Sequence, residues 1–143
     1  MSSKFYPYIL AIVTLIFWGA APIFGKIGLA KLNPYTALAI RSFIVAIIML
    51  VIILVRGDIK ELAKIDLKSV AFIGAEGIFA ALIGQFAYYY ALKLGETSKI
   101  VPIASAFPLI TVLIAAIFLS EKITLLKSSG MFLIIAGVVL LRF

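Results

Sequence analysis

The chain has 143 residues, of which 65% are apolar and 13% are charged, whereas soluble domains are about 45–50% apolar and about 25% charged. A soluble domain of this length has too little interior to bury so much hydrocarbon, so we expect a lipid bilayer to cover it. The absence of Cys and His excludes disulfides and metal sites built on these residues, and the net charge of +7, which is scattered along the chain, favours membrane headgroups over nucleic acid as a partner.

Five apolar runs resemble transmembrane helices, each of which needs about 20 residues. The runs are residues 8–30, 34–55, 69–92, 100–120 and 128–143. The last run is the shortest, and it crosses only if it stands nearly upright or if the bilayer is locally thin. The sequence therefore predicts an all-α integral membrane protein with five transmembrane helices in a single domain, residues 1–143.

Two of the gaps between these runs predict where helices begin and end. Asn33-Pro34 predicts a tight turn, with Pro at the start of the second helix, where its missing N–H costs nothing. The segment 95–97, Gly-Glu-Thr, is expected to end the third helix.

The longest gap, residues 56–68, has a basic residue at every fourth position: Arg56, Lys60, Lys64 and Lys68. On a helix these would form one stripe, with Ile59, Leu62 and Ala63 on another face. The pattern fits a short amphipathic helix on an anionic membrane surface. A solvated loop whose lysines only fix the orientation of the chain explains it equally well.

The orientation of the chain should follow from the Lys and Arg residues in its short loops. The side that holds the N-terminus carries Lys4, Arg56, Lys60, Lys64, Lys68, Lys122 and Lys127. The other side carries Lys26, Lys31, Lys93, Lys99 and Arg142. This small difference favours a cytoplasmic N-terminus in a plasma membrane. A near balance is also typical of a chain that inserts in both orientations, and of an ordinary membrane protein with a weak signal.

Two cationic residues lie within the predicted helices, where ionisable groups are costly and commonly functional. Lys26 lies near the far end of the first helix, and Arg41 lies about 10 Å into the second helix from the same side. The two could frame one cationic patch. Lys26 alone is better explained by snorkelling to the headgroups, whereas the deeper Arg41 favours burial in the bundle or a water-filled cavity.

Glu76 is the third ionisable residue, and it lies about 10–12 Å into the third helix from the opposite side. Because hydrocarbon disfavours a charged carboxylate, Glu76 is a candidate proton carrier. The alternative is a side chain that reaches back to the cytoplasmic interface and pairs with Lys68 or Lys127. The sequence does not decide between these interpretations.

Prolines form a second group of candidate residues. Pro22 is expected to interrupt the first helix, and Pro102 and Pro108 the fourth, each freeing a carbonyl that only protein or water can satisfy inside a membrane. One face of the first helix carries four residues at a spacing of four: Thr14, Trp18, Pro22 and Lys26. This face fits either a cavity lining or a packing stripe.

Small and aromatic residues in the third helix predict packing. Gly74, Gly77, Ala81 and Gly84 form a small-residue face suited to close helix contact. The tyrosines at 88–90 are typical of an aromatic belt at the membrane interface.

In this order, several motifs resemble the EamA family of the drug/metabolite transporter superfamily over essentially the whole chain. They are Phe17-Trp18-Gly19 with Lys26, Arg41, Tyr89-Tyr90-Ala91-Leu92-Lys93, Pro108-Leu109, and Leu119-Ser120-Glu121-Lys122-Ile123-Thr124 followed by Gly130 and Gly137.

The resemblance implies an architecture and a site. Typical members carry ten helices as two five-helix repeats of opposite orientation, and this chain provides one repeat. Two copies, or one copy and a related partner, would then associate antiparallel to rebuild the ten-helix bundle. Trp18, Arg41 and the region around Pro108 would line the central cavity. Glu76 has no counterpart in the family pattern.

The leading hypothesis is a secondary transporter of a small metabolite or drug that works by alternating access and is coupled to protons or driven by exchange. The alternatives are a subunit of a lipid-linked-sugar flippase and a non-transporting assembly subunit. No nucleophile–base pair is visible without His or Cys, so neither an enzyme nor a cofactor is expected. The charge of the substrate stays open, because Lys26 and Arg41 favour an anionic group whereas Glu76 and Trp18 favour a cationic one.

Overall fold

A computed structural model describes residues 5–62 and 64–142, the last of these without its side chain, and these residues contain helices and turns but no strand. Lys4 and Ala63 lie outside the described residues. The chain divides into two compact units that meet between Leu94 and Gly95.

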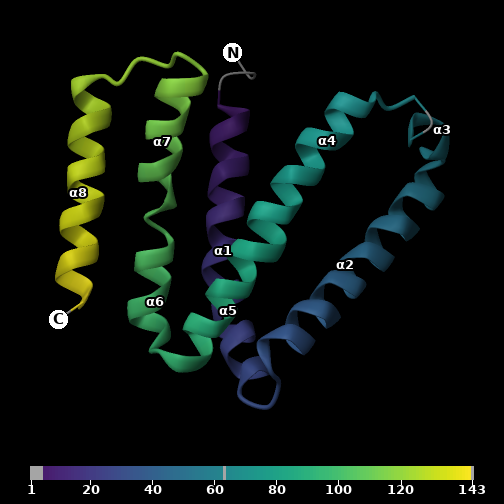
Figure 1. Cartoon of the computed structure of the whole chain (residues 1–143), viewed down its shortest axis with the longest axis horizontal. Helices are drawn as coiled ribbons and strands as arrows, with labels where there is room; N and C mark the ends of the chain where they lie inside the picture. Colours follow the sequence, from purple (N-terminus) through teal and green to yellow (C-terminus); the bar gives the residue numbers. More distant parts are fainter. Residues whose placement is uncertain (1–4, 63, 143) are drawn as a thin grey trace. The chain divides into compact units, whose positions relative to one another are not determined.

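The N-terminal unit is built from long helical rods (Figure 1). Its elements are α1 (Tyr6–Leu29), α2 (Pro34–Arg56), the single turn α3 (Ile59–Leu62), α4 (Leu67–Glu76), the π-helix η1 (Gly77–Gly84) and α5 (Gln85–Leu94). The last three follow one another without a break and form one rod, Leu67–Leu94. The second unit contains α6 (Thr97–Ala104), α7 (Phe107–Phe118) and α8 (Leu125–Arg142), and α8 packs against α6.

Four helical spans in the described part of the chain are long and apolar enough to cross a membrane: Tyr6–Leu29, Pro34–Arg56, Leu67–Leu94 and Thr97–Phe118. The apolar helix Leu125–Leu141 is shorter, as the length of the last run predicts. These residues therefore form an all-helical membrane protein with four spans of sufficient length.

Local side-chain chemistry sets the start and end of α2. The Asn33 side-chain oxygen accepts a hydrogen bond from the Thr36 N–H at 2.8 Å, which satisfies one of the free amides of the first turn. Pro34 is the first residue of the helix. At the other end Gly57 adopts φ 74°, a left-handed conformation that glycine favours. The turn predicted from Asn33-Pro34 is confirmed.

The single basic stripe of the short amphipathic helix considered for residues 56–68 is not formed. Among the described residues between α2 and α4, the helical ones are Ile59–Leu62, while Arg56 ends α2 and Lys68 lies in α4. Two of the basic side chains pair with nearby carboxylates: Arg56 with Asp58 at 2.8 Å and Lys64 with Glu61 at 3.1 Å. Asp66 caps α4 by accepting from the Ser69 N–H at 2.9 Å, and this cap starts a new helix inside the predicted stripe.

The prolines act differently in the first and fourth runs. α1 runs unbroken through Pro22, which is buried, so the expected interruption of the first helix is wrong. In the fourth run α6 continues through Pro102, so the interruption expected there is also wrong. The run breaks at Ser105 and Ala106, between α6 and α7. Pro108 lies in the first turn of α7, where its missing N–H removes the bond that would have continued α6.

The core of the N-terminal unit lies where α1, α2 and α5 meet, beside the α1–α2 turn (Figure 1). The buried leucines of the described residues are Leu29, Leu38 and Leu92, one from each of these helices. Gly25 permits the close approach of α1, because a Cβ there would lie 3.7 Å from a Leu92 methyl group and 3.9 Å from the Tyr89 ring. Nearly all other large apolar side chains are exposed, so lipid or another protein must cover them.

In the described part of the chain, the glycines of the small-residue face of the third run do not contact a neighbouring helix as predicted. A Cβ at Gly74 or Gly77 would meet nothing within 4 Å, and a Cβ at Gly84 would meet the Phe79 carbonyl oxygen of its own rod. These glycines lie instead in or beside η1, whose first and last residues are Gly77 and Gly84. The small residues of this segment therefore belong to the π-helix and not to a contact between two helices.

Candidate functional site

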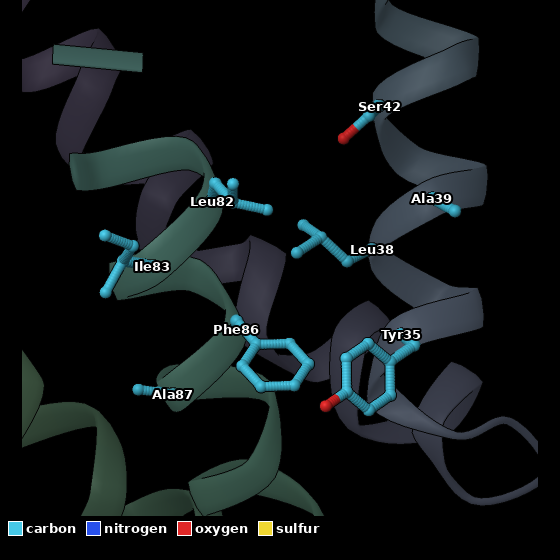
Figure 2. Close-up of a pocket in the computed structure, with 8 residues that line it drawn as sticks. All are labelled: Tyr35, Leu38, Ala39, Ser42, Leu82, Ile83, Phe86 and Ala87. Carbon is cyan, nitrogen blue, oxygen red and sulfur yellow. The ribbon is translucent and has the colours of Figure 1, made fainter. Parts of the chain in front are cut away.

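A groove of about 480 Å³ runs between α2 and the η1–α5 part of the rod (Figure 2). Its lining residues are Tyr35, Leu38, Ala39 and Ser42 from α2, Leu82 and Ile83 from η1, and Phe86 and Ala87 from α5. The volume falls in the range of sites for small molecules, about 300–1,000 Å³. Only two lining side chains, Tyr35 and Ser42, carry a polar group, so the groove suits an apolar body with few hydrogen-bonding groups.

Two rings of the groove lining, Tyr35 and Phe86, form an aromatic cluster with Tyr90. The ring centroids of Tyr35 and Phe86 lie 4.4 Å apart, those of Phe86 and Tyr90 lie 4.9 Å apart, and those of Tyr35 and Tyr90 lie 6.2 Å apart. Figure 2 shows the first two rings facing each other across the groove. Such tilted and edge-on pairs contribute about 0.5–1.5 kcal/mol each beyond the area that they bury. Tyr90, one of the tyrosines interpreted as a belt, therefore also holds α2 against α5.

The groove is not enclosed by the N-terminal unit. Tyr35 is 66% exposed, and Leu82 and Ile83 are each 55% exposed. Buried ligand sites usually cover most of the surface of their ligand. Additional protein or lipid is therefore needed to complete the wall.

The η1 wall is locally constrained. π-Helices are rare and occur mostly as single turns at functional sites, whereas η1 spans eight residues. A Cβ added at Gly84 would lie 3.0 Å from the Phe79 carbonyl oxygen, which is closer than ordinary van der Waals contact. A glycine at this position thus accommodates the π-helical backbone without a clash.

Near the core, a lysine from α1 and a lysine from α5 each donate a hydrogen bond to a backbone carbonyl at or just beyond the end of the other helix. Lys26 of α1 donates to the carbonyl oxygen of Leu92 in the last turn of α5. Lys93 of α5 donates to the Leu32 carbonyl oxygen, just after α1, at 2.7 Å. Carbonyls in the last turn of a helix lack intrahelical partners and attract cations. This reciprocal pair binds α1 to α5, and the two lysines line a cavity of about 280 Å³.

The proposed patch of Lys26 with Arg41 is not formed at this cavity. The second lysine there is Lys93, and Arg41 lines neither this cavity nor the groove. Arg41 is exposed, and it precedes Ser42, so it points about 100° away from that groove-lining residue. The Lys26 ammonium group binds a helix end, and snorkelling of this side chain to the headgroups stays a prediction.

The other candidate residues also lie away from the groove lining. Trp18 is 66% exposed on α1, and Pro108 is half-buried at the start of α7 in the second unit. Glu76 is exposed at the end of α4. Lys127, one of the partners considered for Glu76, pairs with Glu121 at 3.3 Å.

The groove itself was missed by the analysis of the sequence. A signal was present, because Tyr35, Leu38, Ala39 and Ser42 follow the i, i+3, i+4, i+7 spacing of one helix face. In a helix that is apolar on every side, however, that face does not differ in hydrophobicity from the other faces, so the spacing gives no signal.

The chain matches the EamA-like transporter family over residues 5–143. It belongs to that family. It is 35% identical over 133 residues to an uncharacterized protein of Methanocaldococcus jannaschii, with 93% of both chains covered. It is 27% identical over 131 residues to an uncharacterized transporter of Sinorhizobium sp, with 92% of both chains covered. It is 30% identical over 138 residues to an uncharacterized transporter of Archaeoglobus fulgidus, covering 94% of this chain and 46% of that protein. No solved structure matches the chain.

Membership of the EamA family, together with the apolar helices, makes this chain a membrane transporter and favours transport over an enzymatic activity. The segment 119–124, which carried much of the resemblance, has a structural task in the described chain. The Thr124 hydroxyl accepts from the Lys127 N–H at 3.3 Å and so caps the start of α8. Glu121 adds its ion pair with Lys127.

Proposed function

We propose that this EamA-family chain is half of a secondary transporter that moves small metabolites or drugs across the plasma membrane by alternating access. All five apolar runs cross the membrane in this proposal. The 18 residues of α8 give a length of about 27 Å, close to the roughly 30 Å of the hydrocarbon core, so α8 crosses if it stands nearly upright.

The second half comes from an inverted partner, either another copy of this chain or a related one. The observation that carries this proposal is the groove between α2 and the η1–α5 wall, because the exposed faces of Tyr35 and Leu82 leave room for a further wall. The relative from Archaeoglobus fulgidus, of which this chain covers 46%, has the length expected when both halves lie in one chain. Inverted repeats around a midplane site are a general transporter architecture.

An odd number of crossings places the two ends of each copy on opposite sides of the membrane. The nearly balanced Lys and Arg residues then allow the chain to insert in both orientations, so that two copies pair antiparallel. In the orientation that the loop charges favour, the N-terminus is cytoplasmic.

The site residues follow the family pattern in this proposal. Trp18, Arg41 and the turn around Pro108 face the cavity that the two halves enclose. Lys26 acts from the reciprocal lysine pair, where it holds α1 against α5 beside the substrate path. Glu76 carries the coupling proton.

Flux through proteoliposomes that contain the purified chain alone tests the proposal. A panel of small metabolites and drugs should include compounds that move only under an imposed proton gradient or in exchange for an internal pool. Glu76→Gln should abolish the response to the gradient, and Glu61→Gln, in the loop before α4, is the matched control. Absence of flux under every gradient would reject the transporter in favour of an assembly subunit, and movement of polyprenyl-linked lipid alone would favour the flippase.

A further inference from the structure

The π-helix η1 lies between Glu76 and the residues that line the groove. A helix closed by i→i+5 bonds has more residues per turn than an α-helix, so each residue turns through about 80° and not about 100°. Over the eight residues of η1 the difference amounts to roughly 150°. The direction of Glu76 relative to α5 therefore depends on whether this segment is π-helical or α-helical.

The α form would place Glu76 on the groove side of the rod. On a continuous α-helix, residues seven and eleven positions apart share a face. Those positions after Glu76 are Ile83 and Ala87, and both line the groove. With η1 in its π form, the same geometry turns Glu76 roughly half a turn away from that wall. Glu76 is exposed in the structure.

We infer that η1 interconverts between π and α forms during transport and thereby carries Glu76 between the groove and the opposite face of the rod. This inference rests on the proposed function, in which Glu76 is the coupling residue. An ionised carboxylate is disfavoured against an apolar wall, so the carboxylate binds one proton before it turns to the groove. It releases that proton after η1 returns to the π form.

Two features of the rod favour such a conversion. Among the described residues, the main contacts of α4 are with η1, which continues the same rod, and not with a neighbouring helix, so its rotation breaks few tertiary contacts. Gly84 approaches the Phe79 carbonyl oxygen in the π form, and an α-helix does not bring residues i and i−5 into this contact. Gly84→Ala should therefore disfavour the π form selectively, whereas Gly77→Ala, with open space around its new Cβ, is the matched control.

Within the described membrane-crossing spans of the N-terminal unit, Glu76 is the only residue with a carboxyl side chain. The titratable and cationic groups of the elements around the rod are lysines, arginines and tyrosines: Tyr6, Tyr8, Lys26, Tyr35, Arg41, Arg56, Lys68, Tyr88, Tyr89, Tyr90 and Lys93. The carboxyls of Asp58, Glu61 and Asp66 lie in the connection between α2 and α4, with Glu61 and the cationic Lys60 in the single turn α3. A response to acid that is lost in Glu76→Gln is therefore distinguishable from titration of this connection.

Distances between spin labels test the inference directly, because the chain has no native cysteine. The labels are placed at Phe72→Cys, on the Glu76 face of α4, and at Met49→Cys, on the groove side of α2, and the full-length chain is measured in liposomes without substrate. Turning a residue from the far to the near side of a helix should shorten the distance by roughly 10 Å. A second pair, Phe72→Cys with Val51→Cys on the opposite side of α2, is the control for a movement of the whole helix.

The fraction of molecules that show the shorter distance between the labels should increase as the pH falls. The shorter distance should dominate at neutral pH in Gly84→Ala and in Glu76→Gln, but not in Gly77→Ala. Distances that stay unchanged in both Gly84→Ala and Glu76→Gln, in protein shown to be folded by its helical circular dichroism, would overturn the inference. Proton-coupled flux with such unchanged distances would reject the inference alone, whereas the expected shift without any flux would reject the proposed function alone.

Discussion

The two ends of the rod Leu67–Leu94 are both apolar, yet the chain packs only one of them. The α5 end buries Leu92, touches Gly25 of α1 and receives a hydrogen bond from Lys26. At the α4 end, the positions of Gly74 and Gly77 have no neighbour within reach of a Cβ. Apolar surface alone does not drive helices together in lipid, so specific contacts separate a fixed scaffold from a half that is free to move or to meet a partner.

The largest effect on this comparison should come from the packed end. Leu92→Ala removes a fully buried side chain and should lower the free energy of unfolding by about 2 kcal/mol, mainly through lost packing. Leu94→Ala is the control, because Leu94 is 84% exposed. Thermal unfolding in detergent measures both variants, and an equal effect of the two would remove the distinction between the packed and the open end.

The next largest effect should be on flux through the groove, which lies between the packed α5 end of the rod and its open α4 end. Ala39→Phe places a ring among the lining residues and should reduce flux at least about tenfold, which corresponds to about 1.4 kcal/mol of lost binding. Ile40→Phe, on the far side of α2, should leave flux nearly unchanged. Unimpaired flux in Ala39→Phe would show that substrate does not pass through this groove.

A smaller effect should follow from breaking the reciprocal lysine pair. Lys26→Met keeps the stem of the side chain but loses its bond to the Leu92 carbonyl oxygen, and it should lower the free energy of unfolding by about 1 kcal/mol. Lys31→Met, in the exposed turn after α1, is the comparison. If Lys26→Met lost flux at unchanged stability, a direct role in substrate binding would replace the structural one.

The smallest effect concerns the start of α4. Hydrogen bonds from Ser69 hold the pKa of Asp66 below its ordinary value of 3.8, so the cap stabilises α4 above that pH and is lost as the pH falls through the lower pKa of the folded state. Exchange of the Ser69 and Val70 amides should therefore accelerate in strong acid. Asp66→Asn retains an acceptor without a titrating group, and acceleration in this variant as well would assign the effect to another residue.

Local chemistry made part of this fold predictable from the sequence. Asn33-Pro34 indicated the start of α2 because capping and the missing proline N–H act within a few residues. The helix break was predictable only from Pro108, since Pro22 is accommodated in a buried position of the unbroken α1 and Pro102 lies inside α6.

The π-helix and the groove were not predictable in the same way. The small residues from Gly74 to Gly84 are compatible with close packing, with a π-helix or with both, and their spacing does not distinguish these outcomes. The groove needs α2 and α5 to face each other, and an all-round apolar helix gives no periodic signal for which face will do so. Contacts between helices, rather than propensity within them, decide both features.

The account depends most on the pairing of this chain with an inverted copy of itself. Single cysteines at Glu61→Cys, before α4, and at Glu96→Cys, after α5, lie at the two ends of the Leu67–Leu94 span in a chain without native thiols. They should be labelled in intact cells with a membrane-impermeant thiol reagent, before and after permeabilisation. Partial labelling of both sites from outside, completed on permeabilisation, is the predicted result. Complete labelling of one site from outside and none of the other would contradict it.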